Sequence, residues 1–321
     1  MDYEESSSNS IDIENKIAAF LLKKKGLDKN EPAPEYTDLK IITHVAKAQL
    51  GVNLNLNVVS KFLYSILEHN KKYGIDTDLR GVDYLGTKLM LDEKEKKPKK
   101  KREKDGKPKK EKQHGFSSAC TVIVRTSNKD GVPRIVNFKL FDNAKGSISM
   151  TGLEYTSSGM IALEYFLNLI GKNPQFYKNV EDVNKIAISN YQVVNVVSMI
   201  RTNFKIDPIN LDDILKNEYG ILSSWDSSRY SAVYVSYIWN DTNDAKDGLC
   251  HCSKPCVEKE YSGNGIGNGN CKRITISVFQ KGCVMISGAC SLEQTHDAHQ
   301  FIVGILKDNY HEIKKMVIDD L

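Results

Sequence analysis

The chain has 321 residues, of which 40% are hydrophobic and 27% are charged, and its formal net charge is +4. This composition is typical of a soluble globular protein with about two domains, or with one large domain built by duplication. No apolar run approaches the roughly 20 residues that cross a bilayer, and the polar start MDYEESSSNS is unlike a secretory signal. Seven cysteines without such a signal argue against a disulfide framework. We therefore expect a reducing compartment and no membrane partner.

The first half of the chain begins with a polar segment, residues 1–36, which we expect to be flexible apart from a short amphipathic helix in IDIENKIAAFLLKKKG. Hydrophobic periodicity then predicts a strand at residues 39–51, a helix at 54–74 and a further strand at 80–91. Residues 93–115 are almost entirely basic and acidic, with no apolar residue to bury, so they are expected to form a solvated loop. That loop is a simple tether, a phosphate-attracting segment or a nuclear-localisation-like run.

Strands resume after this basic insertion, and the same order of elements follows twice. The first half ends with predicted strands at 116–127, 134–141 and 146–153 and a helix at 157–171. After a connector, the second half has a predicted strand at 188–200, helix at 209–220, strand at 229–239, polar insertion at 241–271, paired strands at 272–290 and helix at 291–315. Ser291 and Gln294 have the spacing of a helix capping box.

Two segments carry the internal repeat most clearly. LFDNAKGSISMTGLEYTSS and VFQKGCVMISGACSLEQ both run from an aromatic residue through a polar turn and an alternating strand to Ser or Thr, Gly and a helix. GVNLNL and NFKIDP hold corresponding places after the first strand of each half. We therefore predict an α+β fold of two repeats, residues 37–173 and 174–321, sharing one curved antiparallel sheet with helices on its convex face. The bare concave face, expected to be largely uncharged, needs a large partner to cover it.

These segments resemble the TATA-box-binding protein family. VVNVVSMI, RYSAVYV and VFQKGCVMISGACSLEQ in the second half are similar to family strands, and LFDNAKGSISMTG and THVAKAQLGVNLNL in the first half are similar more loosely. The basic insertion resembles the versions found in large DNA viruses. The resemblance implies a saddle of two pseudo-symmetric repeats, acting as a transcription initiation factor that binds and bends A·T-rich promoter DNA through the minor groove. The alternative is a protein- or RNA-binding scaffold of the same fold without TATA specificity.

The resemblance also implies partners. They are double-stranded promoter DNA, a B-type initiation factor and the RNA polymerase machinery, with the chain acting as a monomer on DNA. Its location would be the nucleus, or a cytoplasmic viral factory or virion if the protein is viral.

Strand alternation assigns one set of side chains to the DNA and the other to the core. By the family's phase, the groove face holds Thr43, Val45, Ser149, Thr151, Asn195, Val197, Met285 and Ser287. The core face holds Ile148, Met150, Val196, Val233, Val235, Val284 and Ile286. Alternation of this kind also marks any half-buried sheet, so the assignment depends on the repeat and the motif order. Thr43 stands where the family has Asn, which suggests a relaxed or off-centre A·T element.

Aromatic wedges are the second family feature. The resemblance pairs Phe116 with Phe141 and Tyr230 with Phe279 as side chains that insert between base steps and kink the duplex. A single aromatic residue near a strand end is more often part of a core. Four such residues at corresponding places in two halves favour the wedge interpretation.

The insertion of the second half contains Cys250, Cys252, Cys256 and Cys271. Four thiolates can hold a structural Zn²⁺, but the spacing is not the common C-x2-C pair, and free cysteines are the alternative. Other cofactors are not expected. We find no metalloprotease, P-loop or nucleophile-elbow motif, so we do not expect an enzyme.

Overall fold

The computed structural model describes residues 33–91, 119–127, 131–241, 244–253, 256 and 271–315. The predicted N-terminal helix, the basic insertion and Phe116 lie outside these residues. The chain divides into two compact units, of which unit 1 combines Met1–Ile42 with Val196–Leu321 and unit 2 is Thr43–Asn195. The strand Lys40–Gln49 is described with unit 2, and the strand Ser189–Arg201, including Asn195, is described with unit 1. Both boundaries fall within these two strands. Local contacts explain this: Thr37 N donates to Arg201 O, whereas Ala187 N donates to Leu50 O.

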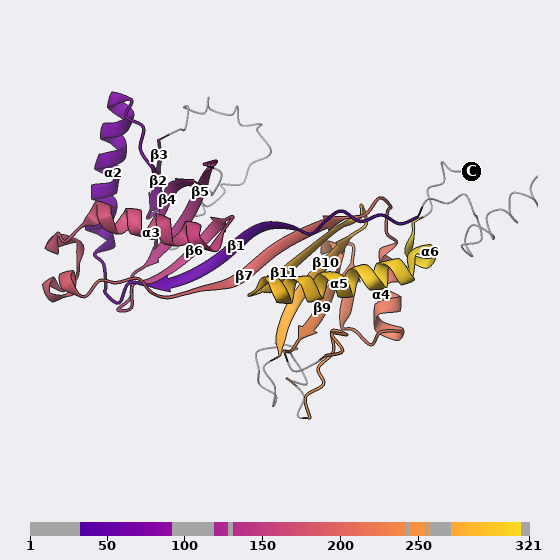
Figure 1. The fold of residues 1–321 in the computed structure, drawn as a ribbon. Helices are drawn as coiled ribbons and strands as arrows, with labels where there is room; N and C mark the ends of the chain where they lie inside the picture. Colours follow the sequence, from indigo (N-terminus) through magenta and orange to yellow (C-terminus); the bar gives the residue numbers. More distant parts are fainter. Residues whose placement is uncertain are drawn as a thin grey trace, which may run out of the picture. The chain divides into compact units, whose positions relative to one another are not determined.

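Unit 2 is an antiparallel sheet with two long helices. Its elements are β1 (Lys40–Gln49), α2 (Leu56–Tyr73), β2 (Leu79–Tyr84), β3 (Thr87–Met90), β4 (Ala119–Ser127), β5 (Pro133–Phe141), β6 (Ser147–Leu153), α3 (Thr156–Ile170), and the short 3₁₀ helices η1 (Pro174–Phe176) and η2 (Val180–Asn184). The strands lie in the order β1-β6-β5-β4-β2-β3, as can be followed in Figure 1. All of the neighbouring pairs described in this unit are antiparallel.

Unit 1 repeats this arrangement. Its elements are β7 (Ser189–Arg201), α4 (Pro208–Asn217), β8 (Ser223–Asp226), β9 (Tyr230–Trp239), β10 (Lys272–Phe279), β11 (Cys283–Ala289), α5 (Leu292–Asp308) and α6 (Tyr310–Ile313). The strand order is β7-β11-β10-β9-β8, again antiparallel. Element by element, β7, β8, β9, β10 and β11 correspond to β1, β2, β4, β5 and β6. The α+β class with antiparallel strands and few helices is therefore confirmed.

The strand registers show that the repeat extends to single residues. In unit 2, Asn137 pairs with Thr151, and Gly152 follows with a φ of 81°. In unit 1, Thr275 pairs with Ser287, and Gly288 follows with a φ of 94°. Both glycines sit in a strand at a backbone angle that other residues rarely adopt, and the neighbouring strand shifts register close to each one. Such bulges fix the register, so equivalent positions of the two units can be assigned without ambiguity.

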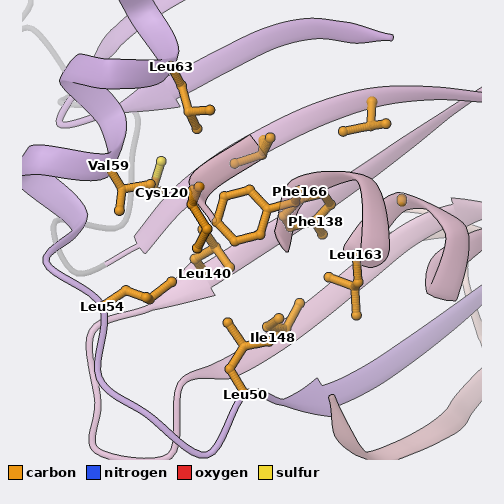
Figure 2. Close-up of a cluster of buried hydrophobic side chains, with 14 of the residues drawn as sticks. Leu50, Leu54, Val59, Leu63, Cys120, Phe138, Leu140, Ile148, Leu163 and Phe166 are labelled. Carbon is orange, nitrogen blue, oxygen red and sulfur yellow. The ribbon is translucent and has the colours of Figure 1, made fainter. Parts of the chain in front are cut away.

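The core of unit 2 lies between its helices and one face of its sheet (Figure 2). Phe138, Ile148 and Cys120 from the strands are buried there with Val59 and Leu63 of α2 and with Leu163 and Phe166 of α3. The rings of Phe138 and Phe166 pack edge to face, with centroids 5.5 Å apart. Because alternate strand residues all reach the same core, the described helices of this unit cover one face of the sheet only.

Unit 1 is built in the same way. Tyr237 of β9 packs against Phe301 of α5 with ring centroids 4.9 Å apart. The indole N–H of Trp239, two residues along the strand, donates to Asp297 of α5 at 2.7 Å. Hydrogen bonds also fix the start of α5, where Gln294 N donates to Ser291 Oγ at 3.2 Å and Gln294 Oε1 accepts from Cys290 N at 2.7 Å. The predicted capping residues therefore do cap this helix.

Two sequence predictions of local structure are corrected. Residues 80–91 form a hairpin of β2 and β3 and not a single strand, because Leu85 and Gly86 turn the chain with φ values of 52° and 81°. A leucine at positive φ is uncommon, and Leu-Gly is not one of the residue pairs that usually mark a two-residue hairpin turn in a sequence. The predicted helix at 291–315 is divided at Asn309, whose side-chain amide donates to Ile305 O at 2.9 Å and to the hydroxyl of Tyr219 at 3.0 Å.

Among the described residues, none of the helices combines the length and the apolar character that crossing a membrane requires.

Candidate nucleic-acid interface

We call the face of each unit's sheet that lies opposite its helices the open face. In unit 1 this face carries Asn195, Val197, Met199 and Arg201 of β7, Met285 and Ser287 of β11, Thr275, Ser277 and Phe279 of β10, and Tyr230 and Tyr234 of β9. Cross-strand pairs place these residues on one face, for example Met285 with Met199 and Phe279 with Ala232. Intervening residues such as Val233, Val235, Val284 and Ile286 are at most 1% exposed. The predicted alternation in unit 1 is therefore confirmed.

The open face of unit 2 follows the same logic. It carries Thr43, Val45 and Lys47 of β1, Ser149 and Thr151 of β6, Asn137, Lys139 and Phe141 of β5, and Thr121, Ile123 and Arg125 of β4. Ile148 and Met150, which alternate with the groove candidates, are at most 2% exposed. Ala46 pairs with Met150, two residues before Gly152, and Ser198 pairs with Ile286, two residues before Gly288. Ala46 and Ser198 are therefore equivalent. Counting back along each strand makes Val45 equivalent to Val197 and Thr43 equivalent to Asn195.

An aromatic pair lies at one end of the open face of unit 1. The rings of Tyr230 and Phe279 meet edge to face with centroids 5.7 Å apart, and Tyr230 is 49% exposed. Tyr230 begins β9 directly after the β8–β9 turn, and it pairs with Asp226 across that turn. Neither ring is buried in the core between sheet and helices.

The turn that precedes Tyr230 is held by its own side chains. Asp226 accepts hydrogen bonds from Ser228 N at 2.9 Å and from Ser228 Oγ at 2.7 Å. The bond from the Ser228 hydroxyl has the largest effect, and together the two bonds lower the pKa of Asp226 below its usual value. An ionised carboxylate thus organises the turn that presents Tyr230.

Of the other predicted wedge pair, Phe116 and Phe141, the structure describes only Phe141. Phe141 ends β5 at the position equivalent to Phe279, because Ala119 pairs with Phe141 as Ala232 pairs with Phe279. It is half-buried on the open face of unit 2. Phe116 lies outside the described residues, so its role stays a prediction. Ala119 is equivalent to Ala232, and Tyr230 stands two residues before Ala232 in the sequence. The sequence position equivalent to Tyr230 is therefore Ser117 and not Phe116.

The expectation of a largely uncharged face is wrong for unit 2. Lys47, Ser149 and Lys139 form a cross-strand row through the middle of its open face. Arg125 lies on the same face, where its guanidinium bonds Asp76 at 2.9 Å and Asp78 at 3.0 Å. Strand alternation in the sequence could have revealed both lysines, because Lys47 shares the parity of Val45 and Lys139 that of Phe141.

The four cysteines of the insertion come together in unit 1. Their sulfur atoms all lie within 4.8 Å of one another. The Sγ atom of Cys271 is 3.5 Å from that of Cys252 and 3.8 Å from that of Cys250, and Cys252 Sγ is 3.9 Å from Cys256 Sγ. The cluster packs on Ile238, an open-face residue near the end of β9. Cys120 lies outside this cluster and is buried in the core of unit 2.

Two known proteins are similar to this chain. The chain is 23% identical over 289 residues to a protein of Acanthamoeba polyphaga mimivirus described as TATA-box-binding protein-like, covering 86% of this chain and 67% of that protein. The predicted resemblance to the TATA-box-binding protein family is confirmed. Among solved structures, the TATA-box-binding protein of Methanococcus jannaschii is similar, with 15% identity, a TM-score of 0.40, and coverage of 85% of this chain and 99% of that one. No model of a protein family matches the chain.

Proposed function

We propose that this chain is a transcription initiation factor that binds A·T-rich duplex DNA through the minor groove, with the open faces of both units, and bends it. The observation that carries the proposal is the Tyr230–Phe279 pair, two neighbouring aromatic rings at the end of an open sheet face. The description of the mimivirus relative as TATA-box-binding protein-like supports it. Promoter selection is the function that this combination suits best.

The chemistry of the minor groove fits the open face of unit 1. At A·T pairs this groove offers only hydrogen-bond acceptors, whereas a G·C pair adds a protruding amino group. The open face of unit 1 is largely apolar at Val197, Met285 and Ser287. A guanine amino group pressed against it would lose its hydrogen bonds to water, which costs free energy. Asn195 adds an amide N–H donor for the A·T acceptors. We therefore assign A·T discrimination to this face.

Tyr230 and Phe279 would act as wedges. Inserting a side chain between base pairs requires a few kcal/mol per unstacked step, and bending a site by a large angle costs on the order of 1–6 kcal/mol, or up to about 10. Flexible TA steps lower that cost, and burial of the rings and of the open face offsets it. Phe141 would play the same part in unit 2.

Within this proposal the chain has no catalytic role and acts as a platform. A B-type initiation factor and the RNA polymerase machinery are the proposed partners, and the chain would bind DNA as a monomer. Its proposed location is the nucleus, or a cytoplasmic viral factory or virion. Residues 93–115 would contact phosphates, in which case their deletion makes binding less dependent on salt.

Competition binding between A·T-rich and G·C-rich duplexes tests the proposal. Phe279→Ala and Tyr230→Ala should each weaken binding to the A·T-rich duplex about 10- to 100-fold, since about 1.4 kcal/mol corresponds to each tenfold change. The matched control is Tyr73→Ala, which removes a tyrosine that is 60% exposed on helix α2. Equal affinity of Phe279→Ala and Tyr73→Ala for the A·T-rich duplex would contradict the wedge role.

A protein- or RNA-binding scaffold is the second candidate, and the Lys47–Ser149–Lys139 row favours it. Lysines bind phosphates of any nucleic acid and acidic protein surfaces alike. A scaffold of this kind binds A·T-rich and G·C-rich duplexes equally. It binds structured RNA or an acidic protein at least as tightly as it binds either duplex. A clear preference for the A·T-rich duplex excludes it.

A further inference from the structure

We propose that Cys250, Cys252, Cys256 and Cys271 bind one structural Zn²⁺ ion that closes the insertion between β9 and β10. This inference does not rest on the proposed function. No comparison assigns a metal to the chain, and the site is argued from the positions of its side chains alone.

The sulfur positions match a tetrahedral site. Zinc binds thiolate sulfur at about 2.3 Å, so two sulfurs on one tetrahedral ion lie about 3.8 Å apart. The three separations given above, 3.5, 3.8 and 3.9 Å, surround that value. They are far longer than the roughly 2.05 Å of a disulfide bond. The four cysteines are spread over more than twenty residues of sequence, yet their sulfur atoms converge on one point, as the ligands of a single metal ion do.

A neighbouring amide supplies the outer shell that such sites need. Asn240 is 6% exposed, and its side-chain N–H₂ group donates to Cys271 Sγ at 3.2 Å and points to Cys252 Sγ at 3.9 Å. A neutral thiol is a weak acceptor, whereas a thiolate is a good one. A buried amide directed at two sulfurs therefore fits sulfurs that are deprotonated and bound to a metal.

The donor set excludes the common ions that prefer oxygen ligands. Soft thiolate ligands in a tetrahedral S₄ arrangement suit zinc or iron and do not suit magnesium or calcium, which prefer oxygen. All four ligand positions are supplied by the chain, and Cys256 and Cys271 are buried. A site closed in this way is structural, because no position is left open for a substrate.

The position of the cluster explains what the ion would do. Cys271 directly precedes β10, and the cluster covers Ile238 near the end of β9. Tyr230 starts the same strand eight residues earlier, about 26 Å away at 3.3 Å per residue. The ion would tie the insertion to the ends of both strands and cover that end of the open face, away from the aromatic pair. Removing it should therefore loosen the insertion and leave the core of unit 1 folded.

Metal analysis of the purified full-length chain tests the site. We expect about one zinc per chain, with Cys252→Ser and Cys271→Ser reducing the zinc content to background. Cys283→Ser and Cys290→Ser, which alter cysteines outside the cluster, are the matched controls and should keep the ion. Asn240→Leu should retain zinc about 10- to 100-fold more weakly in a chelator titration, with an unchanged circular dichroism spectrum.

Thiol chemistry on the wild-type chain provides a test that does not depend on the folding of variants. A thiol-modifying reagent should release the ion, detected with a zinc-sensitive dye. Zinc-free protein with reduced thiols, iron in place of zinc, or mass-spectrometric evidence of disulfides among the four cysteines would each overturn the proposal. Loss of zinc without loss of DNA binding would leave the proposed function unaffected.

Discussion

The two open faces share one scaffold and differ in their surface chemistry. The equivalent cross-strand row consists of Lys47, Ser149, Lys139 and Thr121 in unit 2. In unit 1 it consists of Met199, Met285, Ser277 and Tyr234. One row is cationic and the other is apolar or neutral, although bulges, strand order and core positions correspond. The two units therefore share the geometry of their buried residues and differ in their exposed ones.

This difference suggests a division of labour. Lysine side chains bind phosphates without regard to sequence, whereas a neutral surface with an amide can distinguish A·T from G·C pairs. Unit 2 would then supply most of the salt-dependent affinity and unit 1 most of the discrimination. Substitutions in the shared scaffold and in the divergent surfaces test this comparison.

The largest effect is expected at the bulge glycines. Alanine at Gly152 needs a positive φ and would place its Cβ 2.8 Å from Ile135 O, whereas at Gly288 the corresponding distance to Arg273 O is 3.3 Å. Strained backbone of this kind costs about 1–3 kcal/mol, so Gly152→Ala should approach the upper value and Gly288→Ala the lower. Thermal unfolding measures both. Gly86→Ala is the control for positive φ without crowding, and a Gly152→Ala chain as stable as this control would contradict the shared bulge.

The second prediction concerns the lysine row. Replacing Lys47 by Met and Lys139 by Ser, the residues at the equivalent positions of unit 1, should reduce DNA affinity about tenfold at moderate salt. The slope of log affinity against log salt should fall by about 1.8, since each phosphate contact contributes about 0.9. Titrations at several salt concentrations measure this slope. Lys71→Met with Lys72→Met on α2 is the matched control, and an equal change in that variant would exclude a specific role for the row.

The third prediction concerns Asn195. Its replacement by Ala should lower the preference for A·T-rich over G·C-rich duplex by about 1 kcal/mol, the usual contribution of one hydrogen bond. Non-specific binding should change less. If affinity for both duplexes falls equally in parallel titrations, Asn195 does not read the base pairs.

The smallest effect is expected at the equivalent position of unit 2. Thr43→Asn restores the residue that the resembling family has there, and it should increase the A·T preference by about 0.5–1 kcal/mol. Thr43→Val, which has a similar volume and no donor, should leave the preference unchanged. An increase in both variants would indicate packing and not base reading.

Much of the fold follows from residue patterns. Alternation placed Ile148, Met150 and Val284 in the cores, and the Gly-containing strand ends of the two halves fixed the repeat. Both signals are local, because side-chain parity and positive φ depend on the strand itself. Tyr230 and Phe279 were paired from their motif positions, and their rings do lie together, whereas their contact with DNA stays a prediction.

Other features depend on tertiary contacts and escaped prediction. The strand β8 has four residues and no clear alternation, so only its pairing with β9 defines it. The break at Asn309 results from bonds to Tyr219, far away in the sequence. The four cysteines, in contrast, were grouped as candidate zinc ligands from the sequence, and the structure brings their sulfur atoms together. Lys47 and Lys139 do not depend on such contacts, because their parity with Val45 and Phe141 along the strands already assigns them to the open face.

We propose that the aromatic pair of unit 1 separates neighbouring base pairs of an A·T-rich duplex and so bends it. Fluorescence energy transfer between dyes at the two ends of a short A·T-rich duplex measures this bending. The wild-type chain should shorten the end-to-end distance, and the Phe279→Ala variant, at a concentration that saturates the duplex, should not. A saturated wild-type complex that leaves the duplex straight would contradict the claim.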